Sequence, residues 1–403
     1  SIPRHEIGRS ILIGVVIGLG IALVFVAGFL TRDLIGGPSR VIAQANVDSQ
    51  NYSLLFEVQR LIDEHYLREQ PDFAQRQAAA IRGMLMTLAD RYTFLVDPPV
   101  ARSESDVLAG AYGGIGVQLH RNEAGEITMF PFDDSPAMRA DVETGDVLLA
   151  VNGTPVDLSM QQDQIDQMLR GEVKPGNGVE ITFRKRTDEE LTTFIDFDVI
   201  NVPSVIWRVL EEDARIGYVH VLRFTSRTPE ELRTALEDLK ANEITGLVLD
   251  LRDNSGGLLA ESVAVADEFV DSGTLAFERS RTDIEGFEGS AGGEALGYPL
   301  AVIVNGGTAS GAELLAGAIQ DYARGILIGQ KTYGKGTIQQ IYPLSDQSSL
   351  HVTAAEWLTP DQRALEGDGL TPDIEMIPDA NGRDVEMGEA LRYLTSKLDS
   401  SSG

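Results

Sequence analysis

The sequence predicts an α/β protein with several domains, α+β overall, and three observations lead to this fold class. Continuous apolar strands alternate with amphipathic helices over residues 201–378, which is typical of a mostly parallel sheet covered by helices. Residues 106–200 contain short alternating runs separated by turn residues, as in a small β-rich domain with two helices. Residues 10–30 form one apolar run, which predicts a membrane-spanning helix.

The predicted segments follow the chain in order. They are a cytoplasmic tail (1–9), a transmembrane anchor (10–30), a linker (31–50), an N-terminal helical arm (51–105), a β-rich domain (106–200), an α/β core (201–378) and a C-terminal helix and tail (379–403).

The anchor is predicted from length and flanking charge. The run from Ser10 to Leu30 has 21 residues without a charge, enough to cross a hydrocarbon layer of roughly 30 Å. Arg4 and Arg9 precede it, so the bias of positive residues toward the cytoplasm places everything after Leu30 outside. The alternative is a cleaved signal peptide, which Ala43-Gln44-Ala45 resembles, but the run is long for one and that site lies far beyond it.

Composition excludes several classes of function. Lys and Arg number 33 against 62 Asp and Glu, a formal net charge of −29, so nucleic acid is not an expected partner. The sequence has no cysteine, which rules out thiol catalysis and disulfides. Charged residues at 24% and apolar residues at 43% indicate a chain that folds.

The α/β core has clear local signals. Helical spacing of apolar residues predicts helices over 258–270 and 310–322, and strands are predicted over 246–251 and 299–304. The segment Thr228-Pro229-Glu230-Glu231 predicts a capping box, in which Thr228 caps a helix and Pro229 takes its first position.

Neither histidine nor phosphate-binding motifs predict a site. His220 and His351 each lie within a strand pattern, as packed or edge residues do, and no metal-binding cluster such as H-E-x-x-H occurs. Residues 329–335 resemble the start of a P-loop, but Gly336 stands where Ser or Thr should bind magnesium, and a strand is predicted to follow.

Lys335 lies between Gly334 and Gly336 and is one of two lysines between residues 241 and 396. A lysine without flanking side chains can be enclosed and desolvated, which lowers its pKa and favours the neutral amine that a base requires. The alternative is a lysine in a tight exposed turn.

Ser310 follows a predicted strand and a small-residue turn, Asn305-Gly306-Gly307-Thr308-Ala309, and opens a helix. It could simply form a capping box with Glu313. It could also expose its hydroxyl beside helix N-terminal amides that stabilise an oxyanion. Another strand end, Asp250 to Gly257, finishes in paired glycines whose bare amides could contribute to the same site.

Together these segments resemble the C-terminal processing peptidases, or tail-specific proteases. The family pattern is a small-residue turn with the nucleophile, a Phe/Tyr-Gly-Lys-Gly turn 25 residues later, and a glutamine four residues after the lysine; Ser310, Lys335 and Gln339 match it. The resemblance spans most of the chain. It includes residues 83–85, 114–116, 135–137, 145–146, 250–257, 320–322 and 367–373.

The resemblance implies a crotonase-like α/β protease core with Ser310 as nucleophile, Lys335 as general base and Gln339 orienting the lysine. It implies an oxyanion hole from the amide of Gly311 and one from Gly256 or Gly257. No metal or organic cofactor is implied. Departures from the family pattern are Gly311 and Ala312 for Ala and Ser, Ser255 for Pro, and Asp141 for Gly.

Residues 106–200 would then be a PDZ domain. Backbone amides of Gly114, Ile115, Gly116 and Val117 would bind the free C-terminus of a protein or peptide substrate, with an apolar pocket for its last side chain. Arg170 is a candidate for coupling this domain to the active site. The resulting expectation is a serine endopeptidase that cuts proteins near their C-termini, held by one span in the cell membrane with its folded domains on the extracytoplasmic side.

Two alternatives belong to other classes. One is a catalytically inactive, membrane-anchored PDZ scaffold that binds C-terminal peptides, which would be expected to lack Ser310 or Lys335. The other is a crotonase-like acyl-CoA enzyme, against which the anchor and the PDZ domain argue.

Overall fold

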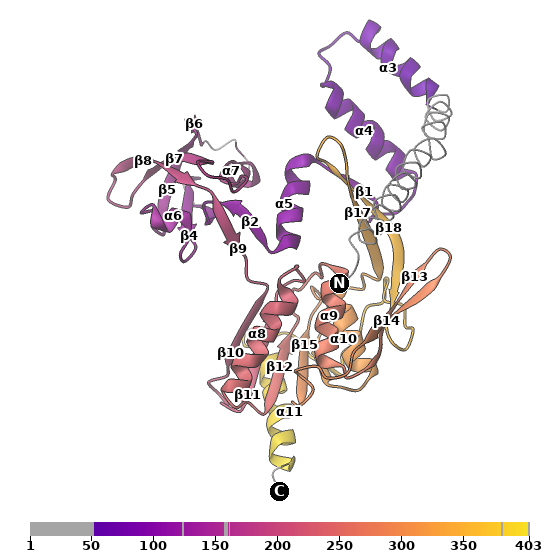
Figure 1. Cartoon of the computed structure of the whole chain (residues 1–403). Coiled ribbons are helices and arrows are strands. Elements are labelled where there is room, and N and C mark those ends of the chain that lie inside the picture. Colours follow the sequence, from indigo (N-terminus) through magenta and orange to yellow (C-terminus); the bar gives the residue numbers. More distant parts are fainter. Residues whose placement is uncertain (1–51, 123–124, 157–159, 161, 380–381, 402–403) are drawn as a thin grey trace, which may run out of the picture. The chain divides into compact units, whose positions relative to one another are not determined.

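The computed structural model describes residues 52–122, 125–156, 160, 162–379 and 382–401 (Figure 1). The chain divides into two compact units, residues 1–77 and 78–403. The predicted tail, anchor and linker over residues 1–50 lie outside the described residues. None of the helices in the described part of the chain is long and apolar enough to span a membrane.

The first unit contains α3 (Ser53–His65) and the beginning of α4 (Phe73–Met86), which agree with the helices predicted for the arm. Arg76 pairs with Asp63 at 2.6 Å, and the Gln70 side chain donates to the carbonyl of Ile62 at 3.1 Å. No side chain of α3 is buried. This unit is therefore held by polar contacts between its helices rather than by a core.

The second unit is built around a six-stranded sheet in the order β10-β11-β12-β15-β16-β19. All neighbouring pairs are parallel except β10 and β11, so the predicted mostly parallel sheet is confirmed. The strands are β10 (Val205–Val209), β11 (Ile216–Val221), β12 (Gly246–Asp250), β15 (Leu300–Val304), β16 (Ile326–Gly329) and β19 (Ile374–Glu375).

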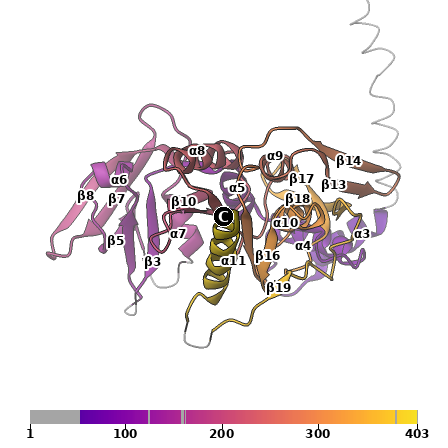
Figure 2. The same ribbon diagram turned by 90° about the horizontal axis from the view of Figure 1, so that it is seen from below.

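Helices cover both faces of this sheet (Figure 2). Side chains alternate along a strand, so Leu247 and Leu249 join the core on one face while Val248 joins that on the other. The first face packs against α8 (Thr228–Ala241), α9 (Leu259–Phe269) and α10 (Gly311–Asp321). The second packs against α11 (Val385–Ser401) through its buried Ala390 and Leu394.

A second sheet is antiparallel and has five strands, in the order β1-β18-β13-β14 with β17 also paired to β18. Most of these strands were not predicted from the sequence. Its strands are β1 (Phe94–Val96), β13 (Gly273–Ser280), β14 (Ile284–Gly289), β17 (Thr337–Pro343) and β18 (Ser349–Leu358). The strand after Lys335 was predicted, and His351 of β18 was placed within a strand pattern. This sheet carries the lysine turn, because β17 begins two residues after Lys335.

The β-rich domain has the sheet β3-β4-β5-β7-β8 with β6 on β5, and a separate pair of β2 and β9. Its strands are β2 (Ala111–Gly114), β3 (Val117–Arg121), β4 (Ile127–Pro131), β5 (Asp146–Val151), β6 (Thr154–Pro155), β7 (Gly178–Arg184), β8 (Glu190–Asp196) and β9 (Asp198–Asn201). Helices α6 (Pro136–Arg139) and α7 (Gln162–Met168) accompany them, as predicted.

One helix was not predicted, and one predicted helix cap is wrong. A helix that was not predicted, α5 (Pro98–Ala109), crosses the expected boundary between arm and β-rich domain at residue 105. Its polar sequence, with prolines at its start, hides the usual apolar period. The predicted capping box at Thr228 does not form, because Thr228 is the first residue of α8 rather than its cap. Its hydroxyl accepts from the Thr225 amide at 2.8 Å, and Glu231 accepts from the Ser204 amide.

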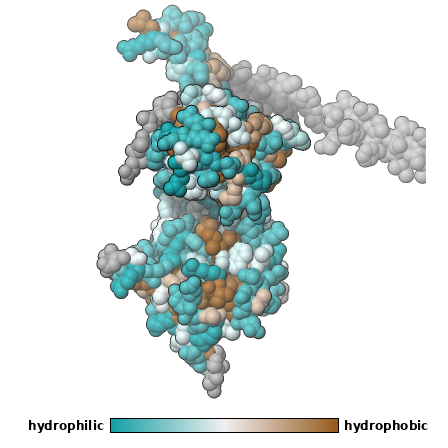
Figure 3. All heavy atoms as spheres, turned by 90° about the vertical axis from the view of Figure 1, so that its left-hand side faces the viewer, coloured by the Kyte–Doolittle hydropathy of each residue, from teal (hydrophilic) through white to brown (hydrophobic). Residues whose placement is uncertain are grey.

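The surface agrees with the acidic composition. On the face shown in Figure 3, hydrophilic residues cover most of the area and hydrophobic residues gather in small patches. Such patches are ordinary for a soluble surface and identify no partner by themselves.

Packing of α11 against the sheet should contribute substantially to stability. Replacing the fully buried Leu394 with alanine is expected to lower the free energy of unfolding by about 2–5 kcal/mol, because it leaves a cavity between helix and sheet. Denaturant titration followed by circular dichroism measures this loss. Ser396→Ala, on the exposed side of α11, is the control; equal effects of both changes would show that α11 does not contribute its apolar face to the core.

Candidate active site

Ser310 lies where β15 is followed by α10, in a turn held from several sides. Its backbone has φ 54° and ψ −121°, a sparsely populated region for a residue with a side chain. The buried Thr308 hydroxyl donates to the carbonyl of Leu251 at 2.8 Å, and the Ala309 amide donates to the carbonyl of Asn254 at 2.9 Å. Such strain persists only where the surroundings fix it, so the serine hydroxyl is held in a defined place.

Gly311 is positioned to offer the first oxyanion donor. The Ser310 amide is already used, because it donates to Glu313 Oε2 at 2.9 Å. Gly311 is the first residue of α10, so its amide has no acceptor within the helix. A Cβ at this position would lie 2.1 Å from Ser262 Oγ. The departure from the family's alanine thus has a steric reason: Ser262 occupies the methyl group's place.

The glycine loop after β12 lies directly against Ser310. A Cβ on Gly256 would fall 2.7 Å from Ser310 Cβ. The Gly256 amide donates to Asn254 Oδ1 at 2.9 Å within its own loop, and Asn254 is fully buried. That amide is therefore occupied, which leaves Gly257 as the better candidate for the second donor.

The amine of Lys335 is held by a glutamine. Its Nζ donates to Gln339 Oε1 at 2.9 Å, and Gln339 Nε2 in turn donates to the carbonyl of Tyr92. The Tyr92 ring centre lies 5.5 Å from the same Nζ. Tyr92 was not singled out in the sequence, because it lies 247 residues from Gln339 and no local pattern connects them.

Burial lowers the pKa of Lys335, since an ammonium group loses solvation when it is enclosed. The carboxylates of Glu104 and Glu366 act in the opposite direction and raise this pKa, but desolvation is the larger effect. The side chain therefore has the property that a neutral amine base requires.

One carboxylate oxygen connects the serine and lysine turns. Glu313 Oε2 accepts from the backbone nitrogens of Ser310 and of Lys335, each at 2.9 Å. Two atoms that are each 2.9 Å from the same oxygen lie at most 5.8 Å apart. The structure thus brings the two predicted catalytic turns together.

The glycine motif at residues 367–370 supports the lysine turn. The Gly367 amide donates to the carbonyl of Gly334 at 2.9 Å. A Cβ on Gly334, whose φ is +83°, would lie 2.9 Å from the Gly369 amide nitrogen. Both segments need glycine there because their backbones approach so closely.

His220 and His351 take part in packing, as the sequence indicated. The buried His351 stacks on Phe94, and its Nε2 lies 3.0 Å from Glu104 Oε2. His220 Nε2 lies 3.3 Å from the carbonyl of Arg252. Within the described residues, no group of three or more His, Asp or Glu side chains is arranged to hold a metal ion.

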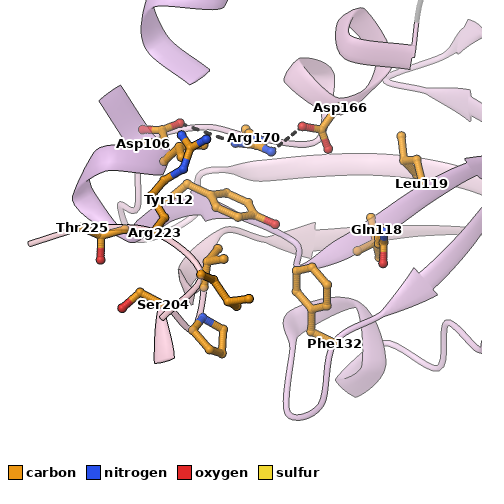
Figure 4. Close-up of a pocket in the computed structure, with 15 residues that line it drawn as sticks. Asp106, Tyr112, Gln118, Leu119, Phe132, Asp166, Arg170, Ser204, Arg223 and Thr225 are labelled. Atoms are coloured by element: carbon orange, nitrogen blue, oxygen red, sulfur yellow. Dashed lines mark hydrogen bonds and ion pairs between the residues drawn. The ribbon is translucent and has the colours of Figure 1, made fainter. Parts of the chain in front are cut away.

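A groove beside the β-rich domain has a cavity volume of about 590 Å³ (Figure 4). One wall is β3, with Val117 and Leu119; residues 202–204, 222, 223 and 225 contribute another. The carboxylate loop predicted at residues 114–117 leads into β3. Its Ile115 amide donates to the carbonyl of Leu169 at 3.3 Å, so this amide is engaged in the present structure.

Arg170 lies in this groove between two acidic side chains (Figure 4). It bonds Asp166 of α7, and its Nη1 lies 3.8 Å from Asp106 Oδ2 of α5. Its guanidinium stands 4.0 Å from the Tyr112 ring centre. The candidate coupling residue therefore contacts both the β-rich domain and the helix that leads into it.

Two domain families match parts of the chain. Residues 215–376 match peptidase family S41, and residues 133–175 match a PDZ domain. A carboxy-terminal-processing protease of Bartonella bacilliformis is 34% identical over 346 residues, which cover 83% of this chain and 78% of that protein. Carboxyl-terminal-processing peptidase 2, chloroplastic, of Arabidopsis thaliana is 33% identical, over 80% of this chain and 65% of that protein.

The chain belongs to the carboxy-terminal-processing protease family. It is therefore a serine-type peptidase with a PDZ domain, and the β-rich domain described above contains that PDZ domain. Among solved structures, a photosystem II D1 C-terminal processing protease is 29% identical, over 80% of this chain and 89% of that one, with a TM-score of 0.48.

Removing a neighbouring negative charge should shift the pH dependence of this protease. In Glu104→Gln the pKa of Lys335 should fall further, because the Glu104 carboxylate raises it. Lys335 would act as a base in its neutral form, so the rising limb of kcat/KM should move to lower pH. Peptide cleavage measured across the alkaline range tests this, with Glu180→Gln on the PDZ domain as the control. A limb that moves to higher pH would contradict the expectation.

Proposed function

We propose that this protease cuts protein substrates near their free C-termini by acyl transfer, with Ser310 as nucleophile and Lys335 as general base. The observation that carries the proposal is the environment of Lys335. Its amine is desolvated and bonded to Gln339, while its backbone nitrogen shares an acceptor oxygen with that of Ser310. A serine hydroxyl that reaches such a neutral amine would be activated without histidine.

The steps follow from these groups. Neutral Lys335 takes the proton of the Ser310 hydroxyl as Oγ attacks the peptide carbonyl, which makes a tetrahedral oxyanion. The amides of Gly311 and Gly257 donate to that oxyanion. The Lys335 ammonium returns the proton to the leaving amine as the C–N bond breaks. Water, deprotonated by the same amine, then attacks the acyl-enzyme, and the Lys335 ammonium returns this proton to Ser310 Oγ as the C–Oγ bond breaks.

Gln339 would orient the base during both proton transfers. Its carbonyl oxygen accepts from Lys335 Nζ, and its amide nitrogen is fixed by the carbonyl of Tyr92. With its donor end engaged in this way, the glutamine presents an acceptor to the lysine. A fixed acceptor restricts where Nζ can lie, which favours transfer along one direction.

The substrate's C-terminus would bind in the groove of the PDZ domain. A peptide added beside β3 would place its carboxylate at the loop of residues 114–117 and its last side chain in the groove, where Val117, Leu119 and Phe132 offer apolar contacts. The Ile115 amide would have to exchange Leu169 for the ligand. This exchange would alter the position of Arg170, because Gly114 pairs with Arg170 in a β-bridge.

We further propose that residues 10–30 anchor the protease in the cell membrane and that its folded domains act on the extracytoplasmic side. The support is the uncharged run of 21 residues and the arginines before it. Substrates there would be membrane and envelope proteins with accessible C-termini.

Single replacements of the two catalytic residues test the mechanism. Ser310→Ala and, separately, Lys335→Ala should each reduce cleavage of a protein with an apolar C-terminal tail to background, because each removes a group needed for acylation. Product masses should show cuts near the C-terminus of the substrate. Full cleavage by Lys335→Ala would rule out the dyad, and tight binding of the tail without cleavage by the unaltered protein would favour a scaffold.

Recognition of the free carboxylate can be tested separately. Amidating the substrate's C-terminus removes the charge that the loop amides would bind, so KM should rise. The unmodified peptide is the matched control. Identical kinetics for acid and amide would contradict capture through residues 114–117 while leaving the Ser310–Lys335 mechanism intact.

A further inference from the structure

We propose that Glu313 is a positioning residue that fixes the nucleophile turn and the base turn to each other; the inference rests on the mechanism proposed above. Glu313 is the third residue of α10, and its carboxylate is fully buried. Among the described residues, no lysine, arginine or histidine forms an ion pair with it. A buried carboxylate without a cation is costly unless hydrogen bonds replace its lost solvation.

Four donors supply these bonds, two for each oxygen. Oε2 accepts from the backbone amides of Ser310 and Lys335, both at 2.9 Å. Oε1 accepts from the Gly334 amide at 2.8 Å and from the Thr332 hydroxyl at 2.5 Å. Three of the four donors belong to the lysine turn. The carboxylate therefore holds that turn against the start of α10.

A helix cap accounts for only one of these four bonds. In a capping box the third residue's carboxylate accepts from the cap residue, here Ser310, and needs no other partner. Glu230 offers a comparison, because it is the third residue of α8 and is exposed to solvent. What distinguishes Glu313 is its burial among donors from residues 332–335, so its role extends beyond α10.

Two consequences for catalysis follow from this geometry. The distance between the Ser310 and Lys335 backbones is limited by a shared acceptor atom, which fixes where the hydroxyl and the amine can meet. In addition, Glu313 takes the Ser310 amide out of use, so the next amide, that of Gly311, becomes the oxyanion donor of this turn. Glu313 therefore acts on both the base and the oxyanion hole without touching substrate.

The lysine turn is supported from its other side through Thr332. The Thr332 hydroxyl donates to Glu313 and accepts from the Leu370 amide at 2.7 Å. The carboxylate is thus the inner end of a chain of bonds that reaches the glycine motif at 367–370. Thr332 offers a way to weaken the arrangement without removing the carboxylate.

Two replacements of Glu313 separate its reach from its charge. Glu313→Asp keeps the charge but withdraws the carboxylate by about 1.5 Å, so it cannot reach both turns, and kcat should fall about a hundredfold with KM unchanged. The rising limb of the pH profile should also move to higher pH, as a looser turn admits water to Lys335.

Glu313→Gln keeps the length of the side chain but has only one good acceptor oxygen. Its kcat should fall about tenfold, since hydrogen bonds to a neutral oxygen are roughly half as strong.

The measurements are kcat, KM and the pH profile on a fluorogenic peptide, with thermal unfolding to verify that each variant is folded. Glu230→Gln is the matched control, because it changes the same helix position without buried partners, and it should leave kcat unchanged. A folded Glu313→Asp enzyme with unaltered kcat and pH profile would overturn the inference. If Ser310→Ala abolishes cleavage in the same assay, that result would leave the proposed mechanism standing.

Should neither Glu313 variant fold, Thr332→Val provides a milder version of the test. It removes one of the four donors at nearly constant volume, so kcat should fall several-fold while KM stays the same. An unchanged kcat in this variant would also overturn the inference.

Discussion

A lysine can act as a base only when it is uncharged, and water stabilises its charged form. Lys335 is enclosed enough for desolvation to outweigh two carboxylates, Glu104 and Glu366, that favour the ammonium. Burial alone would not fix the position of the amine. The hydrogen bond from Lys335 Nζ to Gln339 Oε1 does so. The environment of one amine thus requires that several distant segments of the chain meet around it.

The two sheets of the second unit satisfy this requirement in different ways. The parallel sheet ends in turns at the same edge, so the loops after β12 and β15 place Gly256 against Ser310. Lys335 lies just before β17 of the antiparallel sheet, and Gln339 lies within that strand. Strand β1 pairs with the other side of β18 and begins two residues after Tyr92. Glu313 lies on α10, which packs against the parallel sheet, and it accepts hydrogen bonds from the turn that leads into the antiparallel sheet. Its hydrogen bonds therefore connect the turn after β15 with the turn before β17.

Local chemistry is what the sequence could predict. Apolar periods predicted most strands and helices of the parallel sheet. The small-residue turns made Ser310 and Lys335 candidates, and the family resemblance paired them through their spacing. The features that were not predicted depend on contacts between residues far apart in the chain, or lie in segments without a regular spacing of apolar residues. Tyr92 and Gln339 are 247 residues apart, α5 has a polar sequence, and the antiparallel sheet depends on pairings such as Phe277 with Leu358. Glu313 was visible only as a helix cap, because burial and the donors from another turn exist only in the fold.

The missed helix α5 has a further structural consequence. Residues two apart on a helix point to different sides, and two carboxylates of α5 have that spacing. Glu104 bonds His351 of the antiparallel sheet and influences the pKa of Lys335, whereas Asp106 lies beside Arg170 of the PDZ domain. A helix is stiff over such a short distance, so a displacement at Asp106 would be transmitted to Glu104. The carboxylate that raises the pKa of Lys335 and the carboxylate beside Arg170 in the PDZ groove therefore belong to one helix, α5.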